Sequence, residues 1–162
     1  MTNLTKVLIG ILALITLFLA HELFASDFKM IRPFDDSQGF KVSGRYGESR
    51  NHVQGGVGYS HTGVDYVLAK GTQVLAAESG VIEFFGDGGK YGYGWLAIID
   101  HGNGVKTYYA HLSRQWRLQG MSVRKGELIG EVGDTGNSRG NHLHWEVRKD
   151  GKPVNPWYFV SK

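Results

Sequence analysis

From residue 28 onward, hydrophobic and polar positions alternate, or form short apolar runs, in the way that is typical of β-strands. Such segments cover residues 64–68, 72–77, 80–85, 95–100, 105–111, 127–132 and 142–147. Glycine-rich turn signals, among them GDGGKYGYG, DHGNG and GDTGNSRGN, separate them. Only residues 113–118 favour a short helical turn. The pattern therefore predicts an all-β fold with few or no helices beyond the N-terminal segment.

The first 25 residues have the pattern of a targeting segment, which we leave out of the fold prediction. Residues 7–20 form an apolar run that fits a signal peptide better than a full membrane span. We expect export to the periplasm or cell envelope, with residues 1–25 acting as a signal peptide or as a membrane anchor. The cleavage site stays open, because neither alanine that could precede a cut has a small residue two positions earlier.

The remaining chain has room for one compact domain. Its 162 residues, 41% of them hydrophobic, suffice for a single core, and we expect a monomer. Residues 28–60 show no convincing periodicity, so residues 26–60 are expected to form an ordered arm or loop. Residues 61–162 then form the functional domain.

Composition limits the chemistry that this domain can perform. Cysteine is absent, so any transition-metal site must be built from carboxylates and from the seven histidines. The formal net charge is only +3, and no run of lysine or arginine is interleaved with aromatic residues. We therefore expect no nucleic-acid partner, although a modestly basic exported domain would be attracted to anionic cell-wall polymers.

Three short clusters carry candidate metal and proton chemistry. They are HTGVD with His61 and Asp65, YYAHL with His111, and GNHLHWEV with His142 and His144. Histidines and a carboxylate in this combination suit one zinc ion with proton-transfer groups beside it. The other histidines, at positions 21, 52 and 101, are interpreted as ordinary exposed or hydrogen-bonded residues.

Strand geometry constrains how the first and last clusters can act. An extended chain would separate the Cα atoms of His61 and Asp65 by about 13 Å, so we expect a bend at Gly63. His142 and His144 are about 6.6 Å apart on one strand face, and both rings can enter one site.

The two-residue period also predicts which side chains face the core. In the last strand it puts Leu143, Trp145 and Val147 in the core, with Glu146 on the opposite face beside the two histidines. In residues 105–111 it puts Tyr109 and His111 on one face. Spacing alone does not decide which of the two histidines in GNHLHWEV binds metal.

At these motifs the chain resembles the lysostaphin/LytM-type zinc endopeptidases, which hydrolyse peptidoglycan. The similarity extends over SGRYGESR, KGTQVLAAESGVI and the closing PVNPWYF, and covers about residues 42–159. The resemblance implies an antiparallel β-sheet sandwich with an open groove, of the duplicated-hybrid-motif type. It also implies one zinc ion per chain, with His61, Asp65 and His144 as ligands and His111 and His142 as the catalytic pair.

The implied activity is hydrolysis of peptide cross-links or stem peptides by a metal-activated water. Glu146 would orient a ligand histidine or be an exposed strand carboxylate, and Tyr109 would border the groove or pack on the sheet. Arg45 and Arg139 would bind substrate carboxylates or be plain solvated side chains.

Two other functions are open. One is a non-catalytic cell-wall-binding module or amidase activator with the same fold. The other is a carrier domain of barrel-sandwich type, suggested by the similar segments KGTQV (70–74) and KGELI (125–129). A carrier needs a modifiable lysine at a hairpin tip, and we identify no lysine in that setting.

Overall fold

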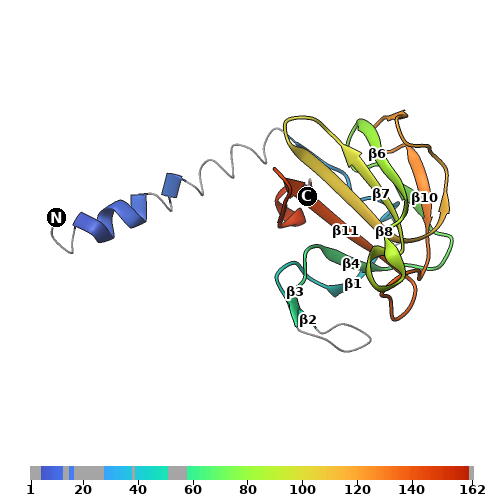
Figure 1. Ribbon diagram of the computed structural model, residues 1–162, viewed down its shortest axis with the longest axis horizontal. Coiled ribbons are helices and arrows are strands. Elements are labelled where there is room, and N and C mark those ends of the chain that lie inside the picture. Colours follow the sequence, from blue (N-terminus) through green and yellow to red (C-terminus); the bar gives the residue numbers. More distant parts are fainter. Residues whose placement is uncertain (1–4, 13–14, 17–27, 38, 51–57, 161–162) are drawn as a thin grey trace.

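The computed structural model describes residues 5–12, 15–16, 28–37, 39–50 and 58–160. Residues 5–12 and 15–16 are helical (Figure 1). Across the described ranges, no helix has both the length and the apolar character needed to cross a bilayer. Most of the segment expected to direct export lies outside the described residues, so that expectation stays a prediction.

The domain is built from short antiparallel strands. In chain order they are β1 (Lys41–Gly44), β2 (Ser49–Arg50), β3 (Tyr59–Ser60), β4 (Val64–Val67), β5 (Gln73–Leu75), β6 (Gly80–Asp87), β7 (Trp95–Asp100), β8 (Val105–Gln115), β9 (Ser122–Val123), β10 (Leu128–Val132), β11 (His142–Lys149) and β12 (Lys152–Val154). Two short helical segments, η1 (Gly89–Tyr93) and η2 (Pro156–Tyr158), accompany them. The predicted all-β, antiparallel fold is confirmed, and each of the seven predicted segments contains a strand.

One sheet connects ten of these strands in the order β1-β4-β11-β8-β7-β6-β9, as Figure 1 shows for its central part. Strand β12 pairs with β11, and β10 pairs with both β5 and β8. The similar segments KGTQV and KGELI lead into β5 and β10, which pair with each other. Strands β2 and β3 form a separate two-stranded ribbon.

The core lies against one face of β11 and its neighbours. Leu143, Trp145 and Val147 are fully buried in the main apolar cluster, as the alternation predicted. Val64 and Tyr66 from β4 join them. Each large apolar side chain buried in this way contributes about 1.5–3 kcal/mol. The packing holds β4 and β11 side by side, with His144 directly opposite Asp65 in the register.

A bulge in β8 changes the predicted direction of His111. The residue has a positive φ of 61°, and the register between β7 and β8 shifts there. Strand β8 pairs with β11 as far as Ala110 and with β10 from Leu112 onward. The extra residue breaks the two-residue period, so His111 lines the groove while Tyr109 stays in the core. The prediction that these two side chains share a face was therefore wrong.

Two other local expectations also differ from the structure. Residues 113–118 form no helical turn, because β8 continues to Gln115 and the Trp116 backbone N–H then donates to the Ile129 carbonyl. The segment expected to be an arm contributes β1, which pairs with β4. It also places Met30 and Phe34 in the core, as single apolar residues without a periodic pattern.

The bend predicted at Gly63 is present, with His61 before the strand and Asp65 in β4. A Cβ atom at Gly63 would lie 2.3 Å from the Trp145 carbonyl oxygen, which is far too close. We therefore expect Gly63→Ala to lower the free energy of unfolding by about 3 kcal/mol, because β4 must move away from β11. Urea denaturation measures this change.

Gly86→Ala in β6 is the matched control for this substitution. Its Cβ would meet only the ring of Phe84, at 3.1 Å, and that side chain can move. We expect a smaller loss than at Gly63. Equal losses in the two variants would show that the close approach of Gly63 to β11 is unimportant.

Candidate metal centre

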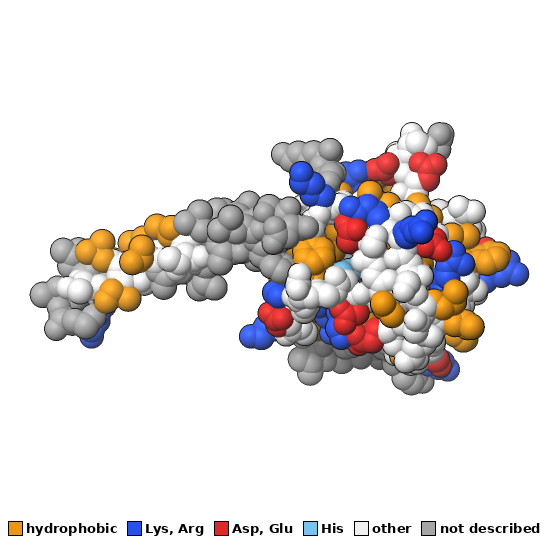
Figure 2. Space-filling view, turned by 90° about the horizontal axis from the view of Figure 1, so that it is seen from above, with side chains coloured by type: hydrophobic (Ala, Val, Ile, Leu, Met, Phe, Trp, Pro, Cys, Tyr) orange, Lys and Arg blue, Asp and Glu red, His pale blue; other side chains and the backbone are white. Residues whose placement is uncertain are grey.

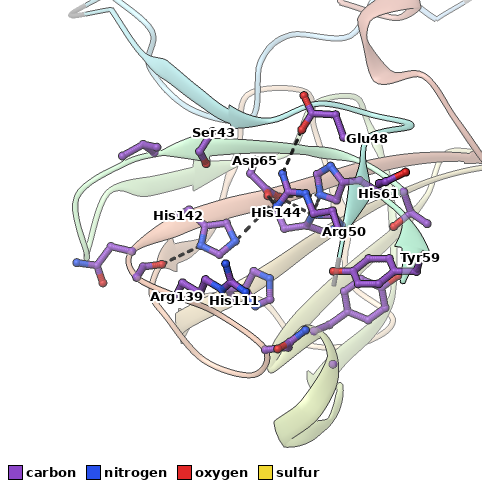
Figure 3. Close-up of a pocket in the computed structure, with 18 residues that line it drawn as sticks. Ser43, Glu48, Arg50, Tyr59, His61, Asp65, His111, Arg139, His142 and His144 are labelled. Atoms are coloured by element: carbon purple, nitrogen blue, oxygen red, sulfur yellow. Dashed lines mark hydrogen bonds and ion pairs between the residues drawn. The ribbon is translucent and has the colours of Figure 1, made fainter. Parts of the chain in front are cut away.

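A groove of about 860 Å³ opens on the face of β4 and β11 that points away from the core. The five metal and proton-transfer residues predicted from the sequence all line this groove (Figure 3). Four of them are buried, and His142 is partly exposed. Its walls come from β1, the β2–β3 ribbon, the segment that contains η1, and the loop between β10 and β11. The charged and aromatic side chains that line it include Arg50, His61, Asp65, Tyr93, His111, Arg139, His142 and His144. In the space-filling view, histidine is visible only as a small area among charges of both signs (Figure 2).

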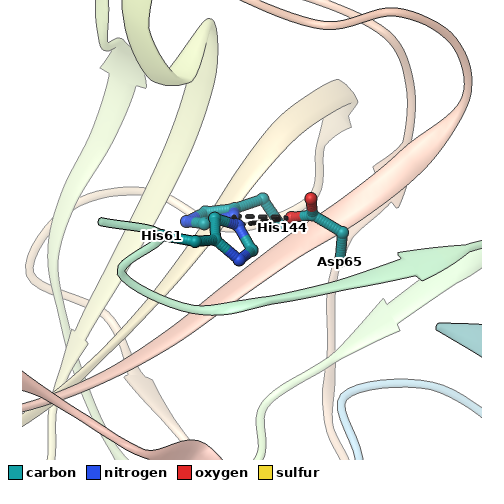
Figure 4. Close-up of side chains that lie close together, drawn as sticks. All are labelled: His61, Asp65 and His144. Atoms are coloured by element: carbon teal, nitrogen blue, oxygen red, sulfur yellow. Dashed lines mark hydrogen bonds and ion pairs between the residues drawn. The ribbon is translucent and has the colours of Figure 1, made fainter. Parts of the chain in front are cut away.

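Three side chains converge on one point of this groove (Figure 4). Nε2 of His61 lies 3.1 Å from Oδ1 of Asp65 and 3.1 Å from Nδ1 of His144. Nδ1 of His144 lies 2.7 Å from the same carboxylate oxygen. Among the residues that the structure describes, these three form the one group spaced to hold a metal ion.

The outer nitrogens of both rings show where their protons lie. Nδ1 of His61 is 2.9 Å from the Arg45 carbonyl oxygen, which can only accept, so this nitrogen carries the proton. Nε2 of His144 is 2.9 Å from Oε1 of Glu146 and donates to that carboxylate. Nε2 of His61 and Nδ1 of His144, which face Asp65, are therefore the nitrogens that would release a proton to bind a metal. Two imidazole nitrogens and a carboxylate oxygen are a donor set that suits zinc.

Electrostatics around the three atoms favour a positive charge between them. Burial opposes ionisation of Asp65, but hydrogen bonds with His144 and His61 outweigh it and hold its pKa well below the ordinary value. Burial also opposes charging of His144, yet hydrogen bonds to Asp65 and Glu146 raise its pKa above the ordinary value. A proton or a metal cation can supply the charge that this geometry attracts.

His111 and His142 lie beside the three converging residues, with ring centroids 4.5 Å apart. The Nδ1–H group of His111 donates to the Thr135 carbonyl at 2.7 Å, and that of His142 donates to the Gly140 carbonyl at 2.8 Å. In both rings Nε2 is therefore the nitrogen left to act on a substrate. Nε2 of His142 lies 4.0 Å from Oδ1 of Asp65.

Burial and the neighbouring imidazoles lower the pKa of His111 to about 3. Its ring is therefore neutral near pH 7, with a lone pair at Nε2.

The four further residues named from the sequence differ in their placement. Arg139 lines the groove, whereas the exposed Arg45 contributes its backbone carbonyl to His61. Tyr109 does not border the groove, because the bulge leaves it in the core, where its hydroxyl accepts from the Ala77 N–H. Glu146 is fully buried rather than exposed on a strand.

Two groove residues were missed by sequence reasoning. Arg50 forms an ion pair of 2.9 Å with Oδ2 of Asp65, the carboxylate oxygen that points away from His144. The phenol of Tyr93 lies 5.9 Å from the ring of His144. Neither side chain was singled out, because only the tertiary fold shows which side chains of the β2–β3 ribbon and of the segment with η1 enter the groove. Of the histidines interpreted as ordinary, His101 contacts the Ser79 carbonyl and the Thr107 hydroxyl, whereas His21 and His52 lie outside the described residues.

The antiparallel fold and this arrangement of two histidines and an aspartate beside a second histidine pair define a β-sheet metallohydrolase. The sequence profile of Peptidase family M23 matches residues 59–156, which is more than half of the chain. The chain belongs to this family, whose members are in general zinc-dependent.

Individual relatives agree with that assignment. The DD-carboxypeptidase/endopeptidase Mpg of Neisseria meningitidis is 55% identical over 96 residues, which are 59% of this chain and 22% of that protein. The murein hydrolase activator NlpD of Escherichia coli is 33% identical over 100 residues, which are 62% of this chain and 26% of that protein. The chain thus spans about a quarter of the length of these curated relatives.

Solved structures show the same fold. The catalytic domain of the antimicrobial peptidase lysostaphin from Staphylococcus simulans superimposes with a TM-score of 0.65 at 31% identity. The match covers 74% of this chain and 91% of that domain. The resemblance to lysostaphin-type enzymes is confirmed.

Proposed function

We propose that the chain is a zinc-dependent endopeptidase that hydrolyses peptide cross-links or stem peptides of bacterial peptidoglycan. The observation that carries this proposal is the convergence of Nε2 of His61, Oδ1 of Asp65 and Nδ1 of His144 in an open groove. Membership of Peptidase family M23 and the similarity to a protein named as an endopeptidase support it.

In the proposed mechanism, His61, Asp65 and His144 would hold one zinc ion, which when bound supplies an acidified water and a Lewis acid for the scissile carbonyl. The rings of His111 and His142 then act through Nε2. One accepts a proton from the attacking water, and the rings together stabilise the developing oxyanion and return a proton to the leaving amine. The carbonyls of Thr135 and Gly140 hold both rings in the tautomer that this requires.

The groove walls suit an extended peptide substrate. Tyr93 lies on one side, together with Arg139 and its neighbours in the loop between β10 and β11. The two segments form one continuous wall, because the Asn137 N–H donates to the Gly92 carbonyl at 2.8 Å. A peptide lying between this wall and the β2–β3 ribbon would present its scissile bond to the two Nε2 atoms.

We also propose that the domain acts outside the cytoplasmic membrane. The apolar run at residues 7–20 supports export, with residues 1–25 either removed or retained as an anchor. A location in the periplasm or cell envelope would bring the groove to its peptidoglycan substrate, where the chain would act as a monomer.

The second candidate function is activation of another cell-wall hydrolase without turnover. The similarity to the activator NlpD favours it. The endopeptidase needs all three converging side chains, because they hold its metal. An activator needs only the surface of the fold.

Metal removal separates these functions. The full chain is incubated with purified peptidoglycan sacculi, and the released peptides are identified by mass spectrometry. We expect a zinc chelator to reduce release to background, because the acidified water is lost, and added zinc to restore it. Release that is insensitive to the chelator, or absent in the presence of zinc, would contradict the endopeptidase proposal.

A further inference from the structure

Glu146 lies behind the proposed metal centre and is unusual in its surroundings. It follows His144 by two residues on β11, and its side chain is fully buried. Unpaired carboxylates are rarely buried, because the loss of hydration is costly. The groups around Glu146 must therefore account for its presence.

Four donors from three parts of the chain surround this carboxylate, two of them on β11 itself. Oε1 accepts from Nε2 of His144 at 2.9 Å, from the Thr62 hydroxyl at 2.5 Å and from the Tyr93 hydroxyl at 2.7 Å. Oε2 accepts from Nε of Arg148 at 2.7 Å. Both oxygens are thus occupied, and one cation balances the negative charge.

Arg148 closes the network around Glu146. Its Nη2 donates to the Tyr93 hydroxyl at 2.7 Å, so the arginine holds the carboxylate and the tyrosine together. Its guanidinium also lies over the ring of Tyr108, 4.1 Å from the centroid. The carboxylate has little freedom to rotate away from His144.

The four groove histidines differ in what their outer nitrogens contact. His61, His111 and His142 donate to the backbone carbonyls of Arg45, Thr135 and Gly140. His144 donates to a carboxylate. A charged acceptor fixes the tautomer of an imidazole and makes its other nitrogen a stronger metal ligand.

We propose that Glu146 is a positioning residue that directs Nδ1 of His144 to the metal and strengthens it as a ligand. Thr62, Tyr93 and Arg148 hold the carboxylate in place for this task. The inference rests on the zinc site of the proposed function. It adds that the affinity of this site depends on a group that does not touch the metal.

The experiment compares Glu146→Gln with the wild-type full chain by competition with a chromogenic zinc chelator. Glutamine preserves the size and one acceptor oxygen but removes the charge. We expect zinc affinity to fall about 10- to 100-fold. Glu131→Gln in β10, a partly buried glutamate that is ion-paired with Arg114 away from the groove, is the matched control and should leave the affinity unchanged.

A second readout follows the tautomer of His144 directly. Long-range proton–nitrogen correlation spectra of the metal-free and zinc-loaded proteins report which ring nitrogen carries the proton. In the wild type we expect the proton on Nε2, with a strongly deshielded resonance that shifts upfield in Glu146→Gln. A structural role alone would leave this resonance unchanged.

Tyr93→Phe keeps the test decisive if the buried substitution unfolds the chain. It removes one donor from Glu146 while leaving the carboxylate in place, and we expect a smaller, several-fold loss of zinc affinity together with a shift of the His144 resonance. Wild-type affinity and an unchanged resonance in a folded Glu146→Gln, or in Tyr93→Phe if the former unfolds, would overturn the role of Glu146. Absence of zinc binding by the wild type would instead refute the zinc site itself, and with it this role.

Discussion

Replacing His144 by alanine is expected to reduce bound zinc from about one ion per chain to almost none, and peptidase activity to background. The substitution leaves only His61 and Asp65, and two side chains do not hold zinc at the dilution of an assay. It also removes the Nε2–H donor that lies 2.9 Å from Oε1 of Glu146. Metal content is measured by atomic absorption after dialysis, and activity by peptide release from sacculi.

His101→Ala is the matched control for this experiment. His101 is a partly buried histidine of the turn between β7 and β8, and its ring contacts the Ser79 carbonyl and the Thr107 hydroxyl rather than the groove. It should retain zinc and activity. Full zinc content in a folded His144→Ala would contradict the assignment of His144 as a ligand.

Replacing His111 by alanine is expected to separate metal binding from catalysis. Zinc content should stay near the wild-type value, because the three converging atoms belong to other residues. The rate of peptide release should fall about 10²- to 10⁴-fold, the usual contribution of a positioned acid or base. The neutral ring, held by the Thr135 carbonyl, is the group lost.

Two measurements on the same preparation decide this prediction. Zinc per chain is determined first, and turnover is then measured with zinc in excess. Loss of metal together with activity would make His111 a ligand instead of a proton-transfer group. His142→Ala should show the same separation, because its Nδ1–H is also held by a backbone carbonyl, that of Gly140.

Much of the fold was predictable because burial follows the two-residue period of a strand. Leu143, Trp145 and Val147 lie in the core as the alternation in β11 predicted. The bend at Gly63 was predictable for a different reason, since distance alone forbids an extended chain between His61 and Asp65.

Other features escaped prediction because they depend on contacts between distant segments. Strand β1 has no clear period, and its pairing with β4 defines it. Residues 113–115 extend β8 instead of starting a helical turn, because β10 provides hydrogen-bond partners for them. A local pattern carries no information on such partners.

The amino-acid sequence by itself determined which residue types were available, namely histidines and a carboxylate without cysteine. It also placed them in motifs of the lysostaphin type, on segments whose polar and apolar residues alternate as in β-strands. Only the tertiary structure decided their directions. The bulge at His111 turns that ring into the groove, and the pairing of β4 with β11 sets Asp65 opposite His144. Bulges and registers arise from hydrogen bonding between strands, so the final geometry of the groove is a property of the folded sheet.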